Sequence, residues 1–375
     1  MVNVEKLVET LDTSGVKFFT GVPDSLLKSF CAYLTDHGRN LIAANEGGAV
    51  GLAAGHYLAT GELACVYMQN SGQGNTVNPL ASLADPDVYS IPMLLVIGWR
   101  GMPGVHDEPQ HVKQGKITLE LMKTLGVPCD VLPETTVKAC ACVKKLIRLA
   151  KKESRPVAVV VKKGTFEEYK LKNREADVAK AKREVVIEKI LKGLPEDAVV
   201  VSTTGMISRE VYEIRERWRR EGTAGGAGCH ARDFLTVGSM GHAVMIALGI
   251  AKAQPKRQVY CFDGDGASIM QMGNMAIVGQ SGCANLTHIV LNNAAHDSVG
   301  GQPTVGGMIN LRAIAKACGY QVHNKVEGMC GGGQRTTPLF VEIKVAKGAR
   351  SDLGRPKEPP QVNKKLFMQT LGGAR

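Results

Sequence analysis

The sequence predicts an α/β protein made of two similar halves, each a parallel sheet flanked by helices. Short apolar runs alternate with helical patterns over residues 1–165, and the same alternation returns after residue 189. Such alternation is typical of βαβ units, which build parallel sheets. The 43 glycines and the 5% aromatic content fit a fold with many tight turns. A chain of 375 residues suits two domains, each able to bury its own core.

The first half contains five apolar runs that we expect to be strands. They are VKFFTGVP (16–23), NLIAANE (40–46), LACVYMQNSG (63–72), IPMLLVIGWRG (91–101) and PVAVVVKKG (156–164). A helix is expected near 136–151. From residue 170 to about 190 the sequence becomes charged and helix-prone, which predicts a linker that runs into the first helix of the second half. The boundaries that follow are a domain over 1–168 and a linker over 169–188.

The second half repeats the pattern. Strands are expected in AVVVSTTG (198–205), QVYCFDGDG (258–266), LTHIVLNN (286–293) and PLFVEIKVAKG (338–348), with DFLTVGSMGHAVMIALGIA (233–251) adding to the same rhythm. A helix is expected over 267–280. GMCGGGQRTT (328–337) reads as a glycine-rich loop. This domain is placed at 189–350, and a polar, proline-rich tail follows at 351–375.

Charge and cysteine usage exclude several classes of protein. The net charge of +11 comes largely from lysine pairs such as Lys144 and Lys145, without interleaved aromatic residues, so a solvated basic face is favoured over nucleic-acid binding. The ten cysteines form no C-x-x-C pair, which argues against iron–sulfur clusters. No apolar stretch is long enough to span a membrane, and the first 20 residues have an amphipathic pattern with acids rather than that of a basic, apolar leader. A cytoplasmic protein is therefore expected.

The most informative segment is GDGASIMQMGNMAIVGQSGCANLTHIVLNN (264–293). Asp265 follows an apolar run and lies between glycines that let the backbone approach a ligand. The next helix would offer its N-terminus to a phosphate, and Asn292 and Asn293 end the following strand. Carboxylate, amide, carbonyl and diphosphate oxygens form the shell that Mg²⁺ prefers. The segment therefore predicts a site for a metal-bound diphosphate, whereas an isolated GDG is more often a simple turn.

The spacing of GDG and NN resembles the signature of the thiamin diphosphate-dependent decarboxylase superfamily. Further segments are similar to its phosphonopyruvate decarboxylase family: GVPDS (21–25), NEGGAVGLAAGHY (45–57), DEPQHVKQG (107–115), DFLTVGSMGHA (233–243) and NNAAHDSVGGQPT (292–304). The resemblance spans nearly the whole chain. It implies a pyrimidine-binding N-terminal domain, a diphosphate- and Mg²⁺-binding C-terminal domain, and no middle domain between them.

The resemblance also implies the cofactor contacts. Because the cofactor's own carbon attacks the substrate, the protein must activate, position and shield it. Glu46 matches the position of the family's activating carboxylate, and Met240 matches the large apolar residue under the cofactor. Mg²⁺ would be held by Asp265, Asn293 and the main-chain carbonyl of Ala295, although many members have Gly where Ala294 stands. Further cofactor contacts are expected from Thr204, Gly205, Gly238, Ser239, Gly264, Gly266 and Ala267.

Substrate residues are expected in the polar segments. Asp24, Ser25, Asn75 and Lys113 are candidate pocket residues, and Arg100, Arg350 and Arg355 are candidates for binding a phosphonate. His111 and His296 are candidates for returning a proton to the substrate carbon after CO₂ leaves.

The resulting expectation is decarboxylation of 3-phosphonopyruvate to phosphonoacetaldehyde in phosphonate biosynthesis, by a homo-oligomer that is at least a dimer. The alternatives are a sulfopyruvate decarboxylase and a non-catalytic thiamin diphosphate-binding subunit.

Overall fold

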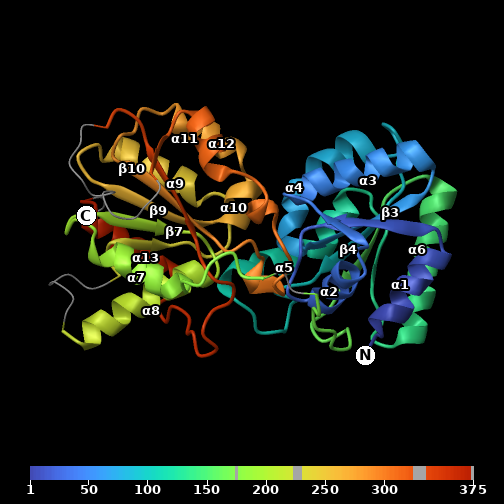
Figure 1. Cartoon of the computed structure of the whole chain (residues 1–375). Helices are drawn as coiled ribbons and strands as arrows, with labels where there is room; N and C mark the ends of the chain where they lie inside the picture. The colour runs from blue at the N-terminus through green and yellow to red at the C-terminus, as the bar shows by residue number, and fades with distance from the viewer. Residues whose placement is uncertain (174–175, 223–229, 324–334, 373–375) are drawn as a thin grey trace. The chain divides into compact units, whose positions relative to one another are not determined.

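The computed structural model describes residues 1–173, 176–222, 230–323 and 335–372. Within these residues the strands form two six-stranded sheets, and every strand pair in them is parallel (Figure 1). The chain divides into two compact units, Met1–Arg174 with Ser298–Gln302 and Glu175–Asp297 with Pro303–Arg375. The predicted fold class, two α/β domains with parallel sheets, is confirmed.

The first unit contains strands β1 to β6, in the order β2-β1-β3-β4-β6-β5 across the sheet. The strands are β1 (Val16–Gly21), β2 (Asn40–Ile42), β3 (Leu63–Gln69), β4 (Leu94–Gly98), β5 (Cys129–Val131) and β6 (Val157–Val161). The helices are α1 (Val4–Thr13), α2 (Lys28–Asp36), α3 (Glu46–Thr60), η1 (Asn70–Gly72), α4 (Gln73–Pro79), η2 (Leu80–Ala84), α5 (Pro109–Thr124) and α6 (Thr136–Glu153).

Helices cover both faces of this sheet, because side chains along each strand alternate between two apolar cores. One core joins α1, α2 and α6 to residues such as Cys65 and Tyr67 of β3. The other joins α3, η2 and α5 to the intervening residues, such as Val66 and Met68. Burial on both faces explains why the central strands read as continuous apolar runs in the sequence.

The second unit contains strands β7 to β12, in the order β11-β12-β10-β9-β7-β8. The strands are β7 (Val199–Ser202), β8 (Asp233–Leu235), β9 (Val259–Gly264), β10 (Leu286–Asn292), β11 (Gln321–His323) and β12 (Leu339–Lys344). The helices are α7 (Arg183–Lys192), α8 (Met206–Arg220), α9 (Ala243–Ala253), α10 (Asp265–Met270), α11 (Gly273–Gly279), η3 (Asp297–Val299), η4 (Val305–Gly307), α12 (Leu311–Cys318) and α13 (Pro360–Thr370).

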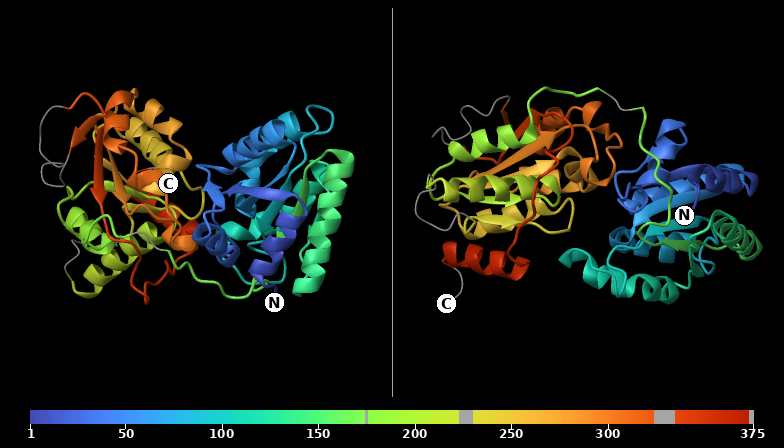
Figure 2. Two further views of the ribbon diagram at one scale, coloured as in Figure 1. Left: turned by 45° about the vertical axis from the view of Figure 1, so that its right-hand side comes forward. Right: turned by 90° about the horizontal axis from the view of Figure 1, so that it is seen from below.

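This sheet is also covered on both faces. Helices α9, α11, α12 and α13 pack on one face, and α7 and α8 pack on the other. The layers of each unit can be followed in the further views of Figure 2. Read from its β8 edge, the sheet runs β8-β7-β9-β10-β12-β11, which repeats the strand order of the first unit. The two units therefore share one topology.

Parallel strands end at one edge of a sheet, and ligands of such folds bind outside that edge, where the strand order reverses. In the first unit this point lies between β1 and β3, and in the second between β7 and β9. Asp24 follows β1 in the first unit, and Thr204 and Asp265 follow β7 and β9 in the second. The shared topology thus places polar candidate residues at equivalent edges of both sheets.

Three features differ from the sequence expectation. The helix expected over 267–280 is two short helices, α10 and α11, because Gln271 leaves the helical conformation with φ −128° and ψ 47°. The tail includes helix α13, which buries Phe367 in the apolar core that also contains residues of α9, α11 and α12. Strands β5 and β11 were not among the expected runs. Much of the glycine-rich segment 328–337 lies outside the described residues.

Across the residues that the structure describes, no helix combines the length and the apolar character needed to cross a membrane.

Candidate functional site

Glu46 is buried at the start of helix α3, just beyond strand β2. The Asn45 side chain caps this helix by accepting a hydrogen bond from the Gly48 amide at 2.9 Å, which fixes where the helix begins. The Asn75 side chain donates to Glu46 Oε2 at 2.7 Å. A Cβ atom at Gly72 would lie 2.2 Å from Glu46 Oε1, so glycine is required there. Burial raises the pKa of Glu46, and the Asn75 hydrogen bond offsets part of the increase.

Asp24 is fully buried beyond strand β1, at the point where the strand order reverses. Its carboxylate accepts hydrogen bonds from Gln69 Nε2 at 2.6 Å and from the Leu26 amide at 3.0 Å. It packs over Gly98, where a Cβ atom would lie 2.0 Å from Asp24 Oδ2. Burial raises the pKa of Asp24 despite these hydrogen bonds. The environment therefore shifts the side chain toward its neutral form.

Arg100 forms hydrogen bonds both to Ser25 and to Asp107, which lies in the loop before helix α5. Its guanidinium donates to both Asp107 oxygens, at 2.8 and 2.5 Å, and to Ser25 Oγ at 2.8 Å. Such a bidentate pair fixes the geometry of both side chains. Burial raises the pKa of Asp107, but the bonds from Arg100 and the Gly101 amide outweigh it and lower the pKa to about 2. A permanent ion pair therefore lies beside Ser25.

His111 is buried in the first turn of helix α5, near this ion pair. Burial and the Arg100 cation lower its pKa to about 4, so it is neutral near pH 7. Its Nδ1 atom has no hydrogen-bond partner among the described residues. Lys113 is exposed two residues further along the helix, and side chains at this spacing do not face each other. His111 and Lys113 are therefore not brought together.

In the second unit, Asp265 is buried at the start of helix α10, directly beyond strand β9. One carboxylate oxygen accepts a hydrogen bond from the main-chain N–H of Asn293 at 3.4 Å, and the other accepts one from the Thr304 hydroxyl. A Cβ atom at Gly306 would lie 2.5 Å from Asp265 Oδ2. Burial raises the pKa of Asp265, and the Thr304 bond is the largest opposing effect. Both oxygens of Asp265 are thus hydrogen-bonded within the second unit, and Gly306 lies close against one of them.

Asn293 and Ala295 follow the neighbouring strand β10, so parallel pairing places them near Asp265. Asn293 Oδ1 accepts from the Ala295 amide at 3.1 Å, and Asn293 Nδ2 donates to Asp297 at 2.5 Å. Between them, Ala294 has φ 55°, a left-handed conformation that favours glycine. This explains physically why glycine suits that position better than alanine.

The remaining candidates of the second unit surround Gly266. A Cβ atom there would lie 3.3 Å from the His296 ring and 3.6 Å from Met240 Cε, so both side chains lie over the same glycine. Burial lowers the pKa of His296 to about 4. Thr204 Oγ1 accepts from the Gly238 amide at 2.9 Å, joining the ends of β7 and β8. Left-handed residues recur in this region, namely Gly205, Gly238, Ser239 and Gly241.

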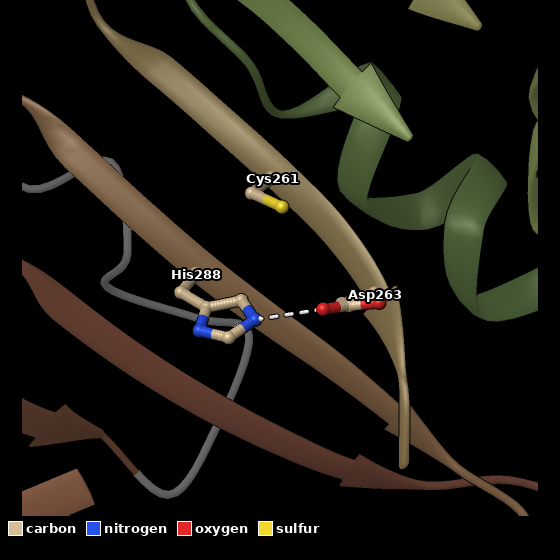
Figure 3. Close-up of side chains that lie close together, drawn as sticks. All are labelled: Cys261, Asp263 and His288. Atoms are coloured by element: carbon tan, nitrogen blue, oxygen red, sulfur yellow. Dashed lines mark hydrogen bonds and ion pairs between the residues drawn. The ribbon is translucent and has the colours of Figure 1, made fainter. Parts of the chain in front are cut away.

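A second polar cluster lies inside the sheet, where Cys261, Asp263 and His288 come together from β9 and β10 (Figure 3). These residue types can bind transition metals. However, Asp263 already accepts hydrogen bonds from Gly264 N, Ser268 Oγ and His288 Nε2. Burial also raises the pKa of the Cys261 thiol well above its ordinary value, which disfavours the thiolate that a metal requires. We interpret the cluster as an anchor for the GDG turn.

Comparison with protein families decides the relationship. The N-terminal TPP binding domain of thiamine pyrophosphate enzymes matches residues 1–122, and the C-terminal TPP binding domain matches residues 226–335. The chain belongs to the thiamine pyrophosphate enzymes. Thiamine pyrophosphate is the cofactor that is also called thiamin diphosphate.

Curated members of this family resemble the chain over almost its whole length. A phosphonopyruvate decarboxylase of Streptomyces viridochromogenes is 35% identical, covering 96% of this chain and 92% of the relative. One of Streptomyces hygroscopicus is 33% identical, covering 98% and 94%. A sulfopyruvate decarboxylase of Methanosarcina acetivorans is 25% identical, covering 98% and 97%.

The residues present fit the cofactor of the thiamine pyrophosphate enzymes. Asp265, Asn293 and the Ala295 carbonyl are hard oxygen donors at adjacent strand ends, and the absent Cβ of Gly306 leaves room for the carboxylate beside them. Glu46 is a buried carboxylate whose pKa is raised by burial, which suits proton sharing with a ring nitrogen. The roles assigned to individual residues remain predictions.

Sequence reasoning missed four partners of these candidates: Gln69, Asp107 as the partner of Arg100, Thr304 and Asp297. No residue type or spacing in the sequence marks any of them as a partner of these candidates. Arg350 is bonded to Glu184, Glu213 and Asp352, so three carboxylates already surround it. This makes Arg350 a weaker candidate for phosphonate binding than Arg100.

Proposed function

We propose that the chain decarboxylates 3-phosphonopyruvate, releasing CO₂ and phosphonoacetaldehyde. The observation that carries this proposal is its 33% and 35% identity, over nearly the whole chain, to two phosphonopyruvate decarboxylases. Identity to the sulfopyruvate decarboxylase is lower at 25% over a similar length. The site chemistry described above supports the same reaction type.

Glu46 is proposed to share a proton with the N1′ nitrogen of the cofactor's aminopyrimidine. When bound, thiamin diphosphate supplies the carbon that attacks the substrate and accepts the charge that CO₂ leaves behind. Burial raises the pKa of Glu46, which favours a carboxyl group that holds a proton. Asn75 donates to one oxygen, so the other is available to the cofactor.

Mg²⁺ is proposed to bind Asp265, Asn293 Oδ1 and the main-chain carbonyl of Ala295. These are oxygen ligands, which the ion prefers, and diphosphate oxygens and water would complete its shell. The cation would also compensate the buried charge of Asp265, whose pKa burial raises. Gly205, Gly238, Ser239 and the Gly264–Ala267 segment are proposed to contact the diphosphate.

The substrate is proposed to lie beside Asp24, Ser25 and Arg100 in the first unit. Phosphonopyruvate carries both a carboxylate and a phosphonate, so its pocket must supply hydrogen-bond donors and must not repel anions. Arg100 and Ser25 are such donors, and burial shifts Asp24 toward its neutral form. His111, neutral near pH 7, and His296 are the candidates for handling the proton that replaces CO₂.

We further propose a homo-oligomer, at minimum a dimer, in which the Glu46 site of one chain and the Asp265 site of another hold the same cofactor molecule. Two alternatives remain for comparison. A sulfopyruvate decarboxylase would use the same residues on a sulfonate. A non-catalytic subunit is disfavoured because one chain carries both Glu46 and the Asp265 and Asn293 pair.

The experiment is CO₂ release by the purified chain with thiamin diphosphate and Mg²⁺, measured on phosphonopyruvate, sulfopyruvate and pyruvate in parallel. We expect the highest kcat/KM on phosphonopyruvate and none of these activities when EDTA removes the metal. A higher kcat/KM on sulfopyruvate would assign the chain to the first alternative. Absence of CO₂ release from all three substrates, with cofactor binding intact, would support the second.

A further inference from the structure

Asp297 lies at the centre of a hydrogen-bond network next to the proposed metal site. Its Oδ2 atom accepts from Asn293 Nδ2 at 2.5 Å, from Arg183 Nη1 at 3.1 Å and from the Gly348 amide at 2.9 Å. The Asp297 side chain is 12% exposed. A largely buried carboxylate with three donors has a fixed position, so it can fix the position of its partners.

The contact between Asp297 and Asn293 determines the orientation of an amide. A side-chain amide has an oxygen that accepts and a nitrogen that donates. The Asp297 carboxylate accepts a hydrogen bond from Nδ2 of Asn293, so the nitrogen faces Asp297 and Oδ1 faces away from it. A flipped amide would present NH₂ to the metal, and NH₂ cannot bind Mg²⁺. The orientation of Asn293 therefore matters for its proposed role as a ligand.

The network is anchored on two helices of the same unit. Arg183, at the start of α7, also donates to both oxygens of Glu210 on α8, at 2.8 and 3.0 Å. Their side chains are 5% and 2% exposed. Buried charges persist when they are paired with good geometry, and this pair stays complete even without Asp297. Helices α7 and α8 thus hold Arg183, and Arg183 holds Asp297.

We propose that Asp297 is a positioning residue of the metal site, whose carboxylate holds Nδ2 of Asn293 and thereby presents Oδ1 of Asn293 to the cation. This inference rests on the proposed function, because it assumes that Asn293 binds Mg²⁺. Asp297 itself does not touch the cofactor in this scheme. Replacing such an outer partner of a metal ligand typically weakens metal affinity by about 10–100-fold.

The test measures the Mg²⁺ concentration that gives half-maximal thiamin diphosphate binding, by calorimetry on the full chain. Asp297→Asn is nearly isosteric, but its amide can offer either end to Asn293. We expect it to raise the half-saturating Mg²⁺ concentration about 10–100-fold. The matched control is Asp352→Asn, an exposed aspartate that also pairs with an arginine, which should leave this concentration unchanged.

A double-mutant cycle separates positioning from a general loss of structure. Asn293→Asp has no amide to orient, so adding Asp297→Asn to it should not raise the half-saturating Mg²⁺ concentration further. An equal increase in both backgrounds, or an unchanged concentration in Asp297→Asn alone, would overturn the proposal. If Asp297→Asn does not fold, Asp297→Ser removes the same carboxylate and carries the same expectation.

Two further measurements separate a failure of the positioning role from a failure of the proposed metal site. Asp265→Ala removes a proposed direct ligand and should abolish Mg²⁺-dependent binding. If Asp265→Ala has this effect and Asp297→Asn has none, the positioning role alone fails. If the unmodified chain binds thiamin diphosphate without regard to Mg²⁺, the metal assignment fails and the positioning role fails with it.

Discussion

At the scale of single residues, the candidate sites contain two kinds of buried charged group. Glu46 and Asp265 are buried carboxylates with few donors, and burial raises the pKa of both. Arg100 and Asp107 form a bidentate pair that stays ionised, with the pKa of Asp107 lowered to about 2. Groups with perturbed pKa values and specific partners are characteristic of functional sites.

Glu46→Gln is expected to retain thiamin diphosphate binding and to lose turnover. An amide cannot exchange a proton with the cofactor, and acid–base groups typically contribute about 10²–10⁴-fold to the rate. The measurement is kcat on phosphonopyruvate with cofactor affinity determined in parallel. Glu62→Gln, an exposed residue of the same unit, is the control. A kcat within about threefold of the unmodified chain, less than ~1 kcal/mol of barrier, would remove Glu46 as the activator.

The pKa of His111 should depend on its neighbour Arg100. Burial and the Arg100 cation depress it to about 4. Arg100→Gln removes the cation and leaves Asp107 unpaired, and both changes favour protonated His111, so its pKa should rise toward the ordinary value of about 6.5. Histidine ¹⁵N shifts measured against pH, assigned with His111→Gln, would report the change. An unaltered pKa would mean that burial alone sets it.

The depressed pKa of His111 also makes the free energy of unfolding depend on pH. Between about pH 4 and the unfolded value of about 6.5, the unfolded chain binds more protons at His111 than the folded chain. Stability from this group therefore rises with pH across that window and falls on acidification. Urea unfolding measured at several pH values should show that His111→Gln loses this part of the pH dependence. If the pH dependence persists in the variant, another group causes it.

At the scale of elements, the sequence predicted the strands with long apolar runs and the helices with clear periodicity. Strand β4 and helix α6 lie where they were expected, because burial on both faces or on one stripe leaves a pattern in the sequence. Strand β5 has three residues and no such pattern. Helix α13 was hidden in a polar tail because only Phe367 is buried on it.

Among the candidate site residues, too, those marked by a local sequence pattern were predicted and those brought together only by folding were not. Glu46, Asp265 and Asn293 were predicted because each lies shortly after a strand in a segment with a recognisable motif. Asp297 and Arg183 were not, because they are 114 residues apart and only the folded chain brings them together. Tertiary partners of this kind leave no local signal in a single sequence.

Helix α13 is expected to stabilise the edge of the second sheet. Asn363 accepts from the Leu235 amide at 3.1 Å and donates to the Asp233 carbonyl at 2.8 Å, so it pairs backbone groups of edge strand β8. Asn363→Ala leaves both groups unpaired, at a cost of about 1–3 kcal/mol. The urea concentration at the unfolding midpoint should fall in Asn363→Ala. It should stay unchanged in Lys365→Ala, which alters an exposed residue of the same helix. Equal midpoints in the two variants would contradict this role.

At the scale of the whole molecule, the chain repeats one strand order and uses each copy for a different part of the proposed chemistry. The first unit carries Glu46 and the candidate substrate residues, and the second carries the candidate metal ligands. In the proposed chemistry, one thiamin diphosphate molecule contacts both kinds of site. The two sites can come from one chain or from two, and this choice decides whether a single chain is active.

Mixing two inactive variants distinguishes these arrangements. Glu46→Gln lacks the proposed activator and Asp265→Ala lacks the proposed metal ligand, so each should be inactive alone. If chains share sites, a mixed dimer contains one site that combines intact Glu46 with intact Asp265, and activity should return after subunit exchange. Up to about a quarter of the unmodified activity is expected at equal mixing, since half of the dimers are mixed and each has one intact site of two. Mixed oligomers that form but stay inactive would show that each chain builds its own site.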